Sequence, residues 1–325
     1  MRRATGGAPG LRIALLAVLI LHCPRGWGQA SHAIASTSPG VEISAEALIG
    51  AAEIGNATLV RSLLDAGAPT DATAEDGLTA LMAAALGGHL ELVRLLLERG
   101  ANVNAADDTG WTALIFAIEE RRADIARELL ARGADPNART RAGWTPLISA
   151  SQLAQPEMIE ALVAHGADLE MKNSFGWPPL MHAVLEGHVE IVRLLLDKGA
   201  DPNARSVNGL TALMIAADHN HVELARLLLD RGANPSFATA HGRTAMSIAK
   251  DNGDGEMVGA LKAAEEKGKA DRGDSRRQRS RMFPYPPCPG MSATAGRCGC
   301  GRMQFRKRYA WSPSFRATFS LSFKR

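Results

Sequence analysis

Three histidines, His89, His188 and His221, are the first residues whose type could carry chemistry, because a neutral imidazole binds transition metals and exchanges a proton near neutral pH. Their separations are 99 and 33 residues, both multiples of one interval. Such spacing places them in a row along a regular array, whereas a metal site or a catalytic base requires side chains that converge on one point. His219 and His241 stand outside the series and are expected to be exposed to solvent.

The remaining reactive side chains form no recognisable site. Asp107 and Asp108 are a pair of carboxylates without a third ligand nearby, which favours a solvated loop tip. Cys288, Cys298 and Cys300 supply three thiols, and a structural zinc needs four ligands, so a disulfide with one odd cysteine, or no defined role, is preferred. The spacings of HExxH, GxSxG, P-loop and EF-hand motifs do not occur. We therefore expect no enzyme activity, no bound metal and no cofactor.

The elements that position these residues recur every 33 residues, which predicts a repeat array rather than ordinary globular domains. Two series are all glycine, one is all alanine and one is all leucine. The members are Gly77, Gly110, Gly143, Gly176, Gly209 and Gly242; Gly67, Gly100, Gly133, Gly166, Gly199 and Gly232; Ala51, Ala84, Ala117, Ala150, Ala183, Ala216 and Ala249; and Leu63, Leu96, Leu129, Leu162, Leu195, Leu228 and Leu261.

Each repeat predicts two short helices separated by a tight break. Gly77 supplies a positive φ for a turn, and Thr79 stands where a helix cap is needed, as do Thr112, Thr145, Thr211 and Thr244. The first helix is rich in alanine, which allows a second helix to approach closely. The second helix begins with an acidic residue such as Glu91, which complements the helix dipole, and ends at Gly100. We expect Leu162 and Leu195 to be buried between consecutive units.

This pattern resembles the ankyrin repeat, most clearly in Gly143-Trp-Thr-Pro-Leu147 and in the segment from His188 to Asn203. The resemblance covers residues 44–268 and implies an all-α solenoid of about seven units, each with two antiparallel helices and an outward hairpin loop. It also implies that His89, His188 and His221 make structural contacts between helices. The first unit and the polar helix ending in Ala263-Ala-Glu-Glu-Lys267 are expected to be caps.

Units three to five depart from the pattern. Unit three has Arg121-Arg122 and unit four has Ala154-Gln155-Pro156 where glycine and histidine are usual, and unit five has Pro178 in place of the capping threonine. We expect these changes to affect local stability without altering the fold.

The two ends differ from the body in charge. Residues 1–30 combine four arginines with an apolar run from Ile13 to Leu21, which predicts a secretory signal cleaved after Ala30, with Ala33 as the alternative site and an uncleaved anchor as the alternative interpretation. Residues 31–43 are expected to be a linker. Residues 269–325 hold 14 Lys and Arg against two Asp, and this basic tail is predicted to be disordered. The body, 31–268, carries a charge of −13.

The predicted binding surface combines aromatic and acidic residues. By the resemblance, the residue after the turn glycine projects from the concave face, and Trp111, Trp144 and Trp177 hold that position in successive units. Tryptophan is enriched at binding hot spots, although it also serves as a packing residue. The first helices present a further set of mostly acidic side chains, which could equally be a solvated helix face: Glu119, Glu120, Gln152, Glu186, Asp218 and His219.

The predicted function is a protein-interaction module, secreted or periplasmic, that presents a rigid concave surface to a protein partner of basic character. The basic tail suggests two alternatives, in which it tethers the protein to an anionic lipid or nucleic-acid surface or covers the acidic groove of its own chain. A third alternative is an accessory factor that supports a partner enzyme. No small-molecule substrate is expected, and the sequence does not indicate an oligomeric state.

Overall fold

The structure is a computed structural model that describes residues 44–266. The chain divides into two parts, Met1–Ala270 and Asp271–Arg325, and all the described residues belong to the first. The predicted secretory signal, linker and basic tail lie outside the described residues.

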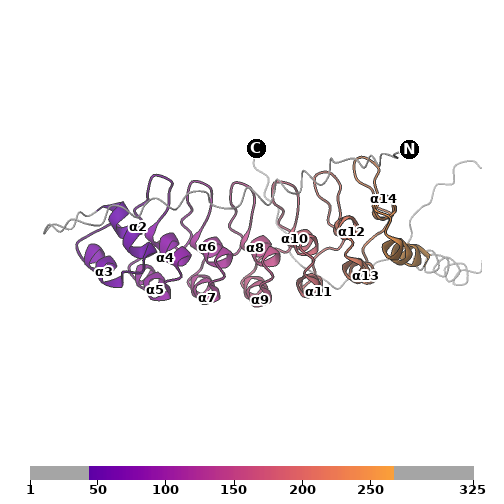
Figure 1. The fold of residues 1–325 in the computed structure, drawn as a ribbon. Helices are drawn as coiled ribbons and strands as arrows, with labels where there is room; N and C mark the ends of the chain where they lie inside the picture. Colours follow the sequence, from indigo (N-terminus) through magenta and orange to yellow (C-terminus); the bar gives the residue numbers. More distant parts are fainter. Residues whose placement is uncertain (1–43, 267–325) are drawn as a thin grey trace, which may run out of the picture. The chain divides into compact units, whose positions relative to one another are not determined.

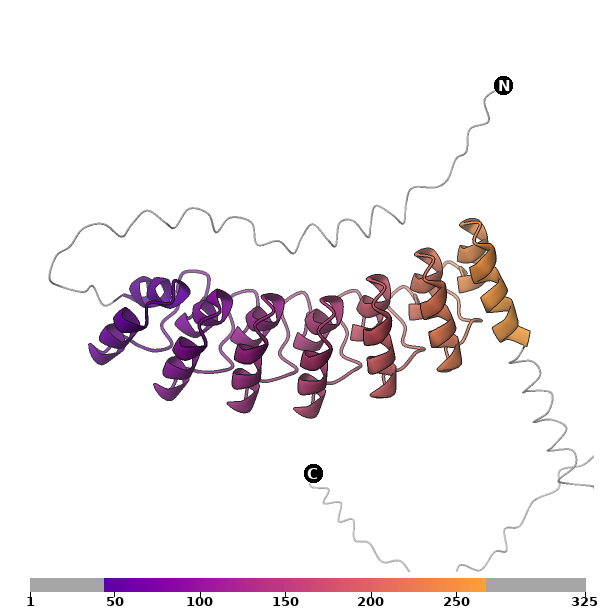
Figure 2. The ribbon, with the colours of Figure 1, turned by 60° about the horizontal axis from the view of Figure 1, so that its bottom comes forward.

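The described residues form seven successive pairs of helices, which confirms the predicted all-α solenoid (Figure 1). The first helices of the pairs are α2 (Ala45–Glu53), α4 (Ala80–Gly87), α6 (Ala113–Glu119), α8 (Pro146–Gln152), α10 (Pro179–Leu185), α12 (Ala212–Asp218) and α14 (Ala245–Asp251). The second helices are α3 (Ala57–Asp65), α5 (Leu90–Glu98), α7 (Ala123–Ala131), α9 (Pro156–Ala164), α11 (Val189–Asp197), α13 (Val222–Asp230) and the helical residues 255–266. Figure 2 shows the pairs following one another in a single row.

The predicted threonine caps start the first helices. Thr79 accepts a hydrogen bond from the backbone N–H of Met82, and Thr112, Thr145, Thr211 and Thr244 repeat this contact in their own units. Pro178 makes no side-chain cap, and α10 instead begins with Pro179, whose fixed φ and missing N–H suit the first helical position. Unit five therefore keeps its first helix without the usual hydroxyl.

The core lies between the two helix layers and between successive units. Every member of the leucine series is fully buried, including Leu162 and Leu195 as predicted, and every member of the alanine series is buried. Alanine at these positions lets the first helix of one unit lie against that of the next, because a larger side chain would force the helices apart.

The histidine series makes the structural contacts that the resemblance implied. The imidazole Nε2 of His89 lies 2.9 Å from the carbonyl oxygen of Glu53, and that of His188 lies 2.9 Å from the oxygen of Gln152. In unit four the amide of Gln155 replaces the imidazole and donates to the oxygen of Ile118 at 2.7 Å. The departure at this position therefore conserves the link between units.

The residues that replace glycine between the two helices of units three and four have a conformational cost. Arg121 and Ala154 adopt φ values of 55° and 51°, in the left-handed region where units two and five have Gly88 and Gly187. A side chain in this region costs roughly 1–2 kcal/mol. Units three and four therefore carry strain that the glycine-containing units avoid.

The hairpins between units are joined to one another through their backbones. The N–H groups of Asp108, Arg141, Ser174, Val207 and Ala240 each donate to a carbonyl oxygen in the preceding hairpin, at 2.8–3.2 Å. The turn glycines permit this approach: a Cβ on Gly176 would lie 2.6 Å from the nitrogen of Val207, whereas a Cβ on Gly242, in the last hairpin, would meet no atom within 4 Å. Close hairpin contact therefore requires glycine in the inner units.

A comparison of two alanine substitutions tests this requirement. Gly176 and Gly242 have nearly the same φ, 77° and 76°. We expect Gly242→Ala to cost roughly 1–2 kcal/mol of unfolding free energy through backbone strain alone. Gly176→Ala adds a steric clash of about 1–3 kcal/mol. Urea denaturation monitored by circular dichroism measures both, and equal costs would contradict the hairpin packing.

One repeat position of the hairpins holds asparagine in three units and other residues elsewhere, among them Asp71 and Glu170. Asn104 accepts from the N–H of Asp135 and donates to the oxygen of Gly133, at 2.7 and 3.1 Å, and Asn137 and Asn203 make equivalent bonds. In unit five Glu170 accepts from the N–H of Asp201 at 2.8 Å, but a carboxylate cannot donate to the oxygen of Gly199. Burial of the carboxyl raises the pKa of Glu170 above its ordinary value of 4.5, although the bond from Asp201 opposes this.

Glu170→Asn should therefore stabilise the array by about 0.5–1.5 kcal/mol, because the amide restores the missing donor. Because the pKa of Glu170 is raised in the folded protein, this residue adds to the unfolding free energy of the wild type below pH 4.5. That stabilisation is lost as the pH rises through the folded pKa. The advantage of the variant should consequently grow with pH across that interval. Thermal denaturation of both proteins at acidic and neutral pH measures it, and a constant difference would refute the assignment.

Candidate binding face

The three tryptophans do not project equally, and the prediction for Trp144 is wrong. Its side chain is only 5% exposed, and its ring packs on His182 of the next unit with centroids 4.8 Å apart. Trp111 and Trp177 are half-buried; Trp111 packs on Phe116 at 5.1 Å and Trp177 on His182 at 5.5 Å. Trp144 is thus a packing residue, and the other two keep part of their surface available for contact.

His182 was not identified from the sequence, although it lies between two of these rings. The side-chain oxygen of Asn173 accepts the backbone N–H groups of Phe175 and Trp177, both at 3.0 Å. The amide nitrogen of Asn173 therefore faces Nε2 of His182, 3.1 Å away. Because that nitrogen can only donate, the contact is a hydrogen bond in the tautomer whose Nε2 accepts. The sequence offers one clue to His182: the same repeat position holds Ala83, Phe116, Ser149 and Ile215 in other units, so a histidine there is unusual.

The predicted acidic residues share one place in the repeat, the C-terminal end of a first helix. Glu119 and Asp218 are the last residues of α6 and α12. Glu120 and Glu186 occupy the C-cap positions of α6 and α10. Gln152 is the last residue of α8, and His219 is the C-cap residue of α12. Glu120 and Glu186 are exposed, whereas Glu119 and Asp218 are partly buried. Helix carbonyl ends carry partial negative charge, so these carboxylates add to an already negative edge. Arg121 and Arg122 interrupt it in unit three.

Aromatic and acidic residues therefore form two separate rows. The tryptophans precede the first helices and the acids end them, and a helix of seven residues is about 10 Å long. The first-helix face is defined here as the surface of the first helices between Trp111 and Trp177 on one side and Glu120, Glu186 and Asp218 on the other. A side chain that spans this face must be about that length.

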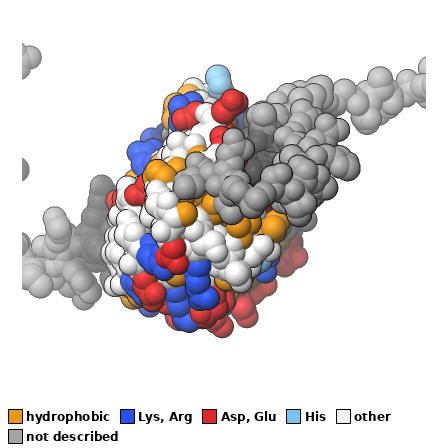
Figure 3. All heavy atoms as spheres, turned by 90° about the vertical axis from the view of Figure 1, so that its left-hand side faces the viewer, with side chains coloured by type: hydrophobic (Ala, Val, Ile, Leu, Met, Phe, Trp, Pro, Cys, Tyr) orange, Lys and Arg blue, Asp and Glu red, His pale blue; other side chains and the backbone are white. Residues whose placement is uncertain are grey.

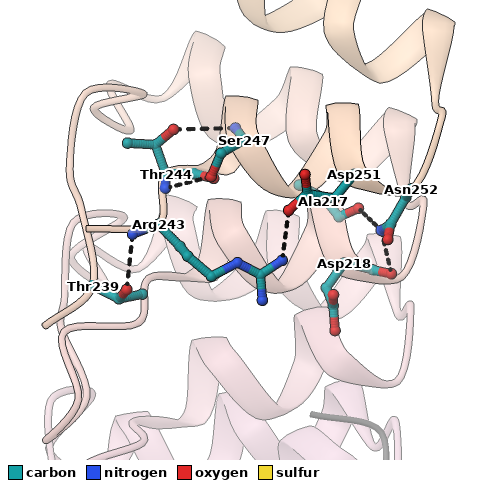
Figure 4. Close-up of polar contacts among 8 residues, drawn as sticks. All are labelled: Ala217, Asp218, Thr239, Arg243, Thr244, Ser247, Asp251 and Asn252. Atoms are coloured by element: carbon teal, nitrogen blue, oxygen red, sulfur yellow. Dashed lines mark hydrogen bonds and ion pairs between the residues drawn. The ribbon is translucent and has the colours of Figure 1, made fainter. Parts of the chain in front are cut away.

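Unit seven shows such a side chain. Arg243 occupies the repeat position of the tryptophans, and its guanidinium reaches Asp251 at the other end of α14, with 3.3 Å between Nη2 and the carboxylate (Figure 4). Asn252 beside it donates to the carbonyl oxygens of Ala217 and Asp218, at 3.4 and 3.3 Å. An arginine laid across the first-helix face thus finds a carboxylate of the acidic row.

The second helices offer a less suitable surface, because many of their charges are paired with each other. Arg94 binds Glu128, Arg127 binds Glu157, Arg226 binds Glu256 and Arg231 binds Asp197, at 2.6–3.2 Å between neighbouring units. In Figure 3, which views the array from the end formed by its first unit, acidic and basic side chains lie together along the lower edge, over these helices. These ion pairs occupy carboxylates that a basic partner would otherwise bind on this side.

Two further features bear on what the array can do. Within residues 44–266, no group of three or more His, Cys, Asp and Glu side chains is placed to hold a metal ion. No helix in the same part of the chain is long and apolar enough to cross a membrane.

A matched pair of serines in α8 tests the packing beneath the first-helix face. Ser149 and Ser151 are both buried, but the hydroxyl of Ser151 donates to the oxygen of Leu147 at 2.7 Å, whereas that of Ser149 has no hydrogen-bond partner. We expect Ser149→Ala to raise the unfolding free energy by about 1 kcal/mol and Ser151→Ala to lower it. Chemical denaturation distinguishes them, and destabilisation by Ser149→Ala would show that its hydroxyl is satisfied.

Comparison of the chain with known protein families and solved structures agrees with this geometry. The family model described as "Ankyrin repeats (3 copies)" matches residues 48–140, 138–206 and 204–271. Among solved structures, the ankyrin repeat domain of Bcl-3, described as a unique member of the IkappaB protein family, is 31% identical, with a TM-score of 0.60. The match covers 66% of this chain and 97% of that domain. No curated protein sequence matches the chain. Because the family model covers most of the sequence and the helix pairs repeat as it requires, the chain belongs to the ankyrin-repeat family.

Proposed function

We propose that this ankyrin array acts outside the cytoplasm and binds a basic segment of a protein partner along the first-helix face. Ankyrin arrays are protein-interaction modules, which gives the general function. The observation that carries the finer proposal is Arg243, whose side chain crosses the face and places its guanidinium on Asp251. A partner's arginine or lysine laid across α10 or α12 would meet Glu186 or Asp218 in the same way.

Aromatic surface supports the same site. Trp111 and Trp177 retain exposed area at the opposite edge of the face, and aromatic side chains contribute strongly to binding when a partner covers them. Their rings are also held by Phe116 and His182, so little side-chain entropy is lost on association. The proposed mechanism is the display of a preformed surface, in which carboxylates select a basic partner and tryptophans anchor it.

The partner-binding test uses the full chain as bait for the extracytoplasmic fraction of the producing cell. Glu186→Lys with Asp218→Lys reverses the acidic edge, and Trp111→Ala with Trp177→Ala removes the aromatic edge. We expect each pair to weaken retention of the captured protein by at least about tenfold. Glu190→Lys with Glu223→Lys is the matched control, because this pair makes the same charge change on exposed second-helix positions.

Retention that is unaffected by the edge variants, or equally reduced by the control, would place binding elsewhere. Circular dichroism of each variant shows whether the helices are intact. The location is tested separately: mass spectrometry of the protein in the extracytoplasmic fraction should find a new N-terminus after Ala30, and a protein found only inside the cell with residues 1–30 attached would contradict it.

A further inference from the structure

The tips of the hairpins form a continuous, ordered surface that the proposed function does not use. The tips are residues 72–77, 105–110, 138–143, 171–176, 204–209 and 237–242, and Figure 1 shows the hairpins projecting on the same side of the helices. Backbone hydrogen bonds join each tip to the next, from Asp108 N to Asp76 O at 2.9 Å through to Ala240 N to Asn208 O at 3.0 Å. We call this surface the hairpin ridge. Its continuous hydrogen bonding makes it a fixed template rather than a set of independent loops.

The charge of the ridge changes sign along its length. The first two tips carry Glu75, Asp76, Asp107 and Asp108 and no cation. The next three carry Arg139, Arg141, Lys172 and Arg205 and no acid. The acids of these later hairpins, Asp135, Asp168, Glu170 and Asp201, lie before the tips and accept backbone N–H groups there. The sign therefore reverses between the tips 105–110 and 138–143.

The charged residues of the tips form no ion pairs with one another. Arg139, Lys172 and Arg205 each donate to a backbone carbonyl of the following hairpin, at 2.9–3.0 Å, which holds the side chain but leaves its charge. No ion pair within residues 44–266 includes any charged residue of the five charged tips. Glu75, Asp108 and Arg141 are exposed. The charged groups of the tips are therefore free of ion pairs within the described residues and can pair with those of a second molecule.

Exposed apolar side chains stand in the same row. Phe175 is 52% exposed and Val207 is 76% exposed, and the N–H of Val207 donates to the oxygen of Phe175 at 3.2 Å, so the two are adjacent. Both lie in the basic half of the ridge. An interface that covers the tip 171–176 would add burial of Phe175 to charge recognition.

We propose that the hairpin ridge is the interface of an antiparallel dimer of this chain. A surface whose charge reverses along its length is complementary to its own copy turned by 180°, which is the condition for a twofold interface. With the axis between the tips 105–110 and 138–143, Asp108 of one copy faces Arg141 of the other, and the reverse contact follows by symmetry. The same operation sets Glu75 against the tip that holds Lys172 and Phe175.

The chain's own basic tail fits this ridge less well. Residues 269–325 contain 14 Lys and Arg and two Asp, so the tail complements the acidic tips and is repelled by the basic ones. A second copy sets the basic tips 138–143 and 171–176 against the acidic tips 105–110 and 72–77 at once. This inference uses a different surface from the proposed function, and substitutions at Trp111, Trp177, Glu186 and Asp218 should leave the dimer intact.

The test is sedimentation equilibrium of the full chain at low and high salt. We expect a dimer at about 50 mM salt that dissociates at about 500 mM, because exposed charges are screened within a few ångströms at high ionic strength. D108R and R141D should each weaken dimerisation by at least about tenfold by setting like charges against each other. D108R/R141D in one chain should restore it, since each reversed side chain again meets its opposite.

A mixture of the two single variants should form heterodimers for the same reason. E223R, an exposed charge reversal on α13, is the matched control and should leave the dimer unchanged. Thermal melting of each variant shows that the monomer is folded. A monomer at low salt, a dimer that survives D108R, or a double variant that fails to recover would each overturn the proposal.

Discussion

The contact on which the rest of the structure depends is the approach of one hairpin backbone to the next at the turn glycine. Gly77, Gly110, Gly143 and Gly176 leave no space for a Cβ, because backbone atoms of the following hairpin would lie 2.6–3.0 Å from it. This contact sets the separation of the units at their loop end, while the buried alanines set it at the helices. A regular separation places equivalent residues of successive units in straight rows, and every candidate surface of this protein is such a row.

The rows differ in how their charged residues are arranged. On the second helices, opposite charges alternate between units and pair, as Arg127 does with Glu157. At the ends of the first helices, carboxylates recur without a matching row of cations, and Arg243 in the last unit shows how a cation can reach them. On the hairpin tips the charge is segregated by unit. One repeat geometry therefore supports a side on which opposite charges pair, an acidic edge and a ridge whose tips change sign along the array.

The features that repeat could be predicted from the sequence, and those that depend on a single unit could not. The Thr79 and Thr145 caps and the buried Leu162 and Leu195 followed from spacing, because each position has the same environment in every unit. Trp144 was placed wrongly because its environment is set by His182 in the next unit, where other units have Phe116 or Ile215. The sequence placed Trp111 and Trp144 directly before predicted caps, but the separation of about 10 Å from the acids required the observed bounds of the first helices.

Amide hydrogen exchange at the hairpin tips measures whether successive hairpins are fixed to one another. The N–H groups of Asp108, Arg141, Ser174, Val207 and Ala240 belong to surface loops, yet each is bonded to the preceding hairpin. We expect these five amides to exchange slowly, at rates close to those of the helix amides, because only separation of the units releases them. Exchange at the rate of unprotected loop amides would show that the hairpins move independently, and neither the first-helix face nor the hairpin ridge would then be the fixed surface described here.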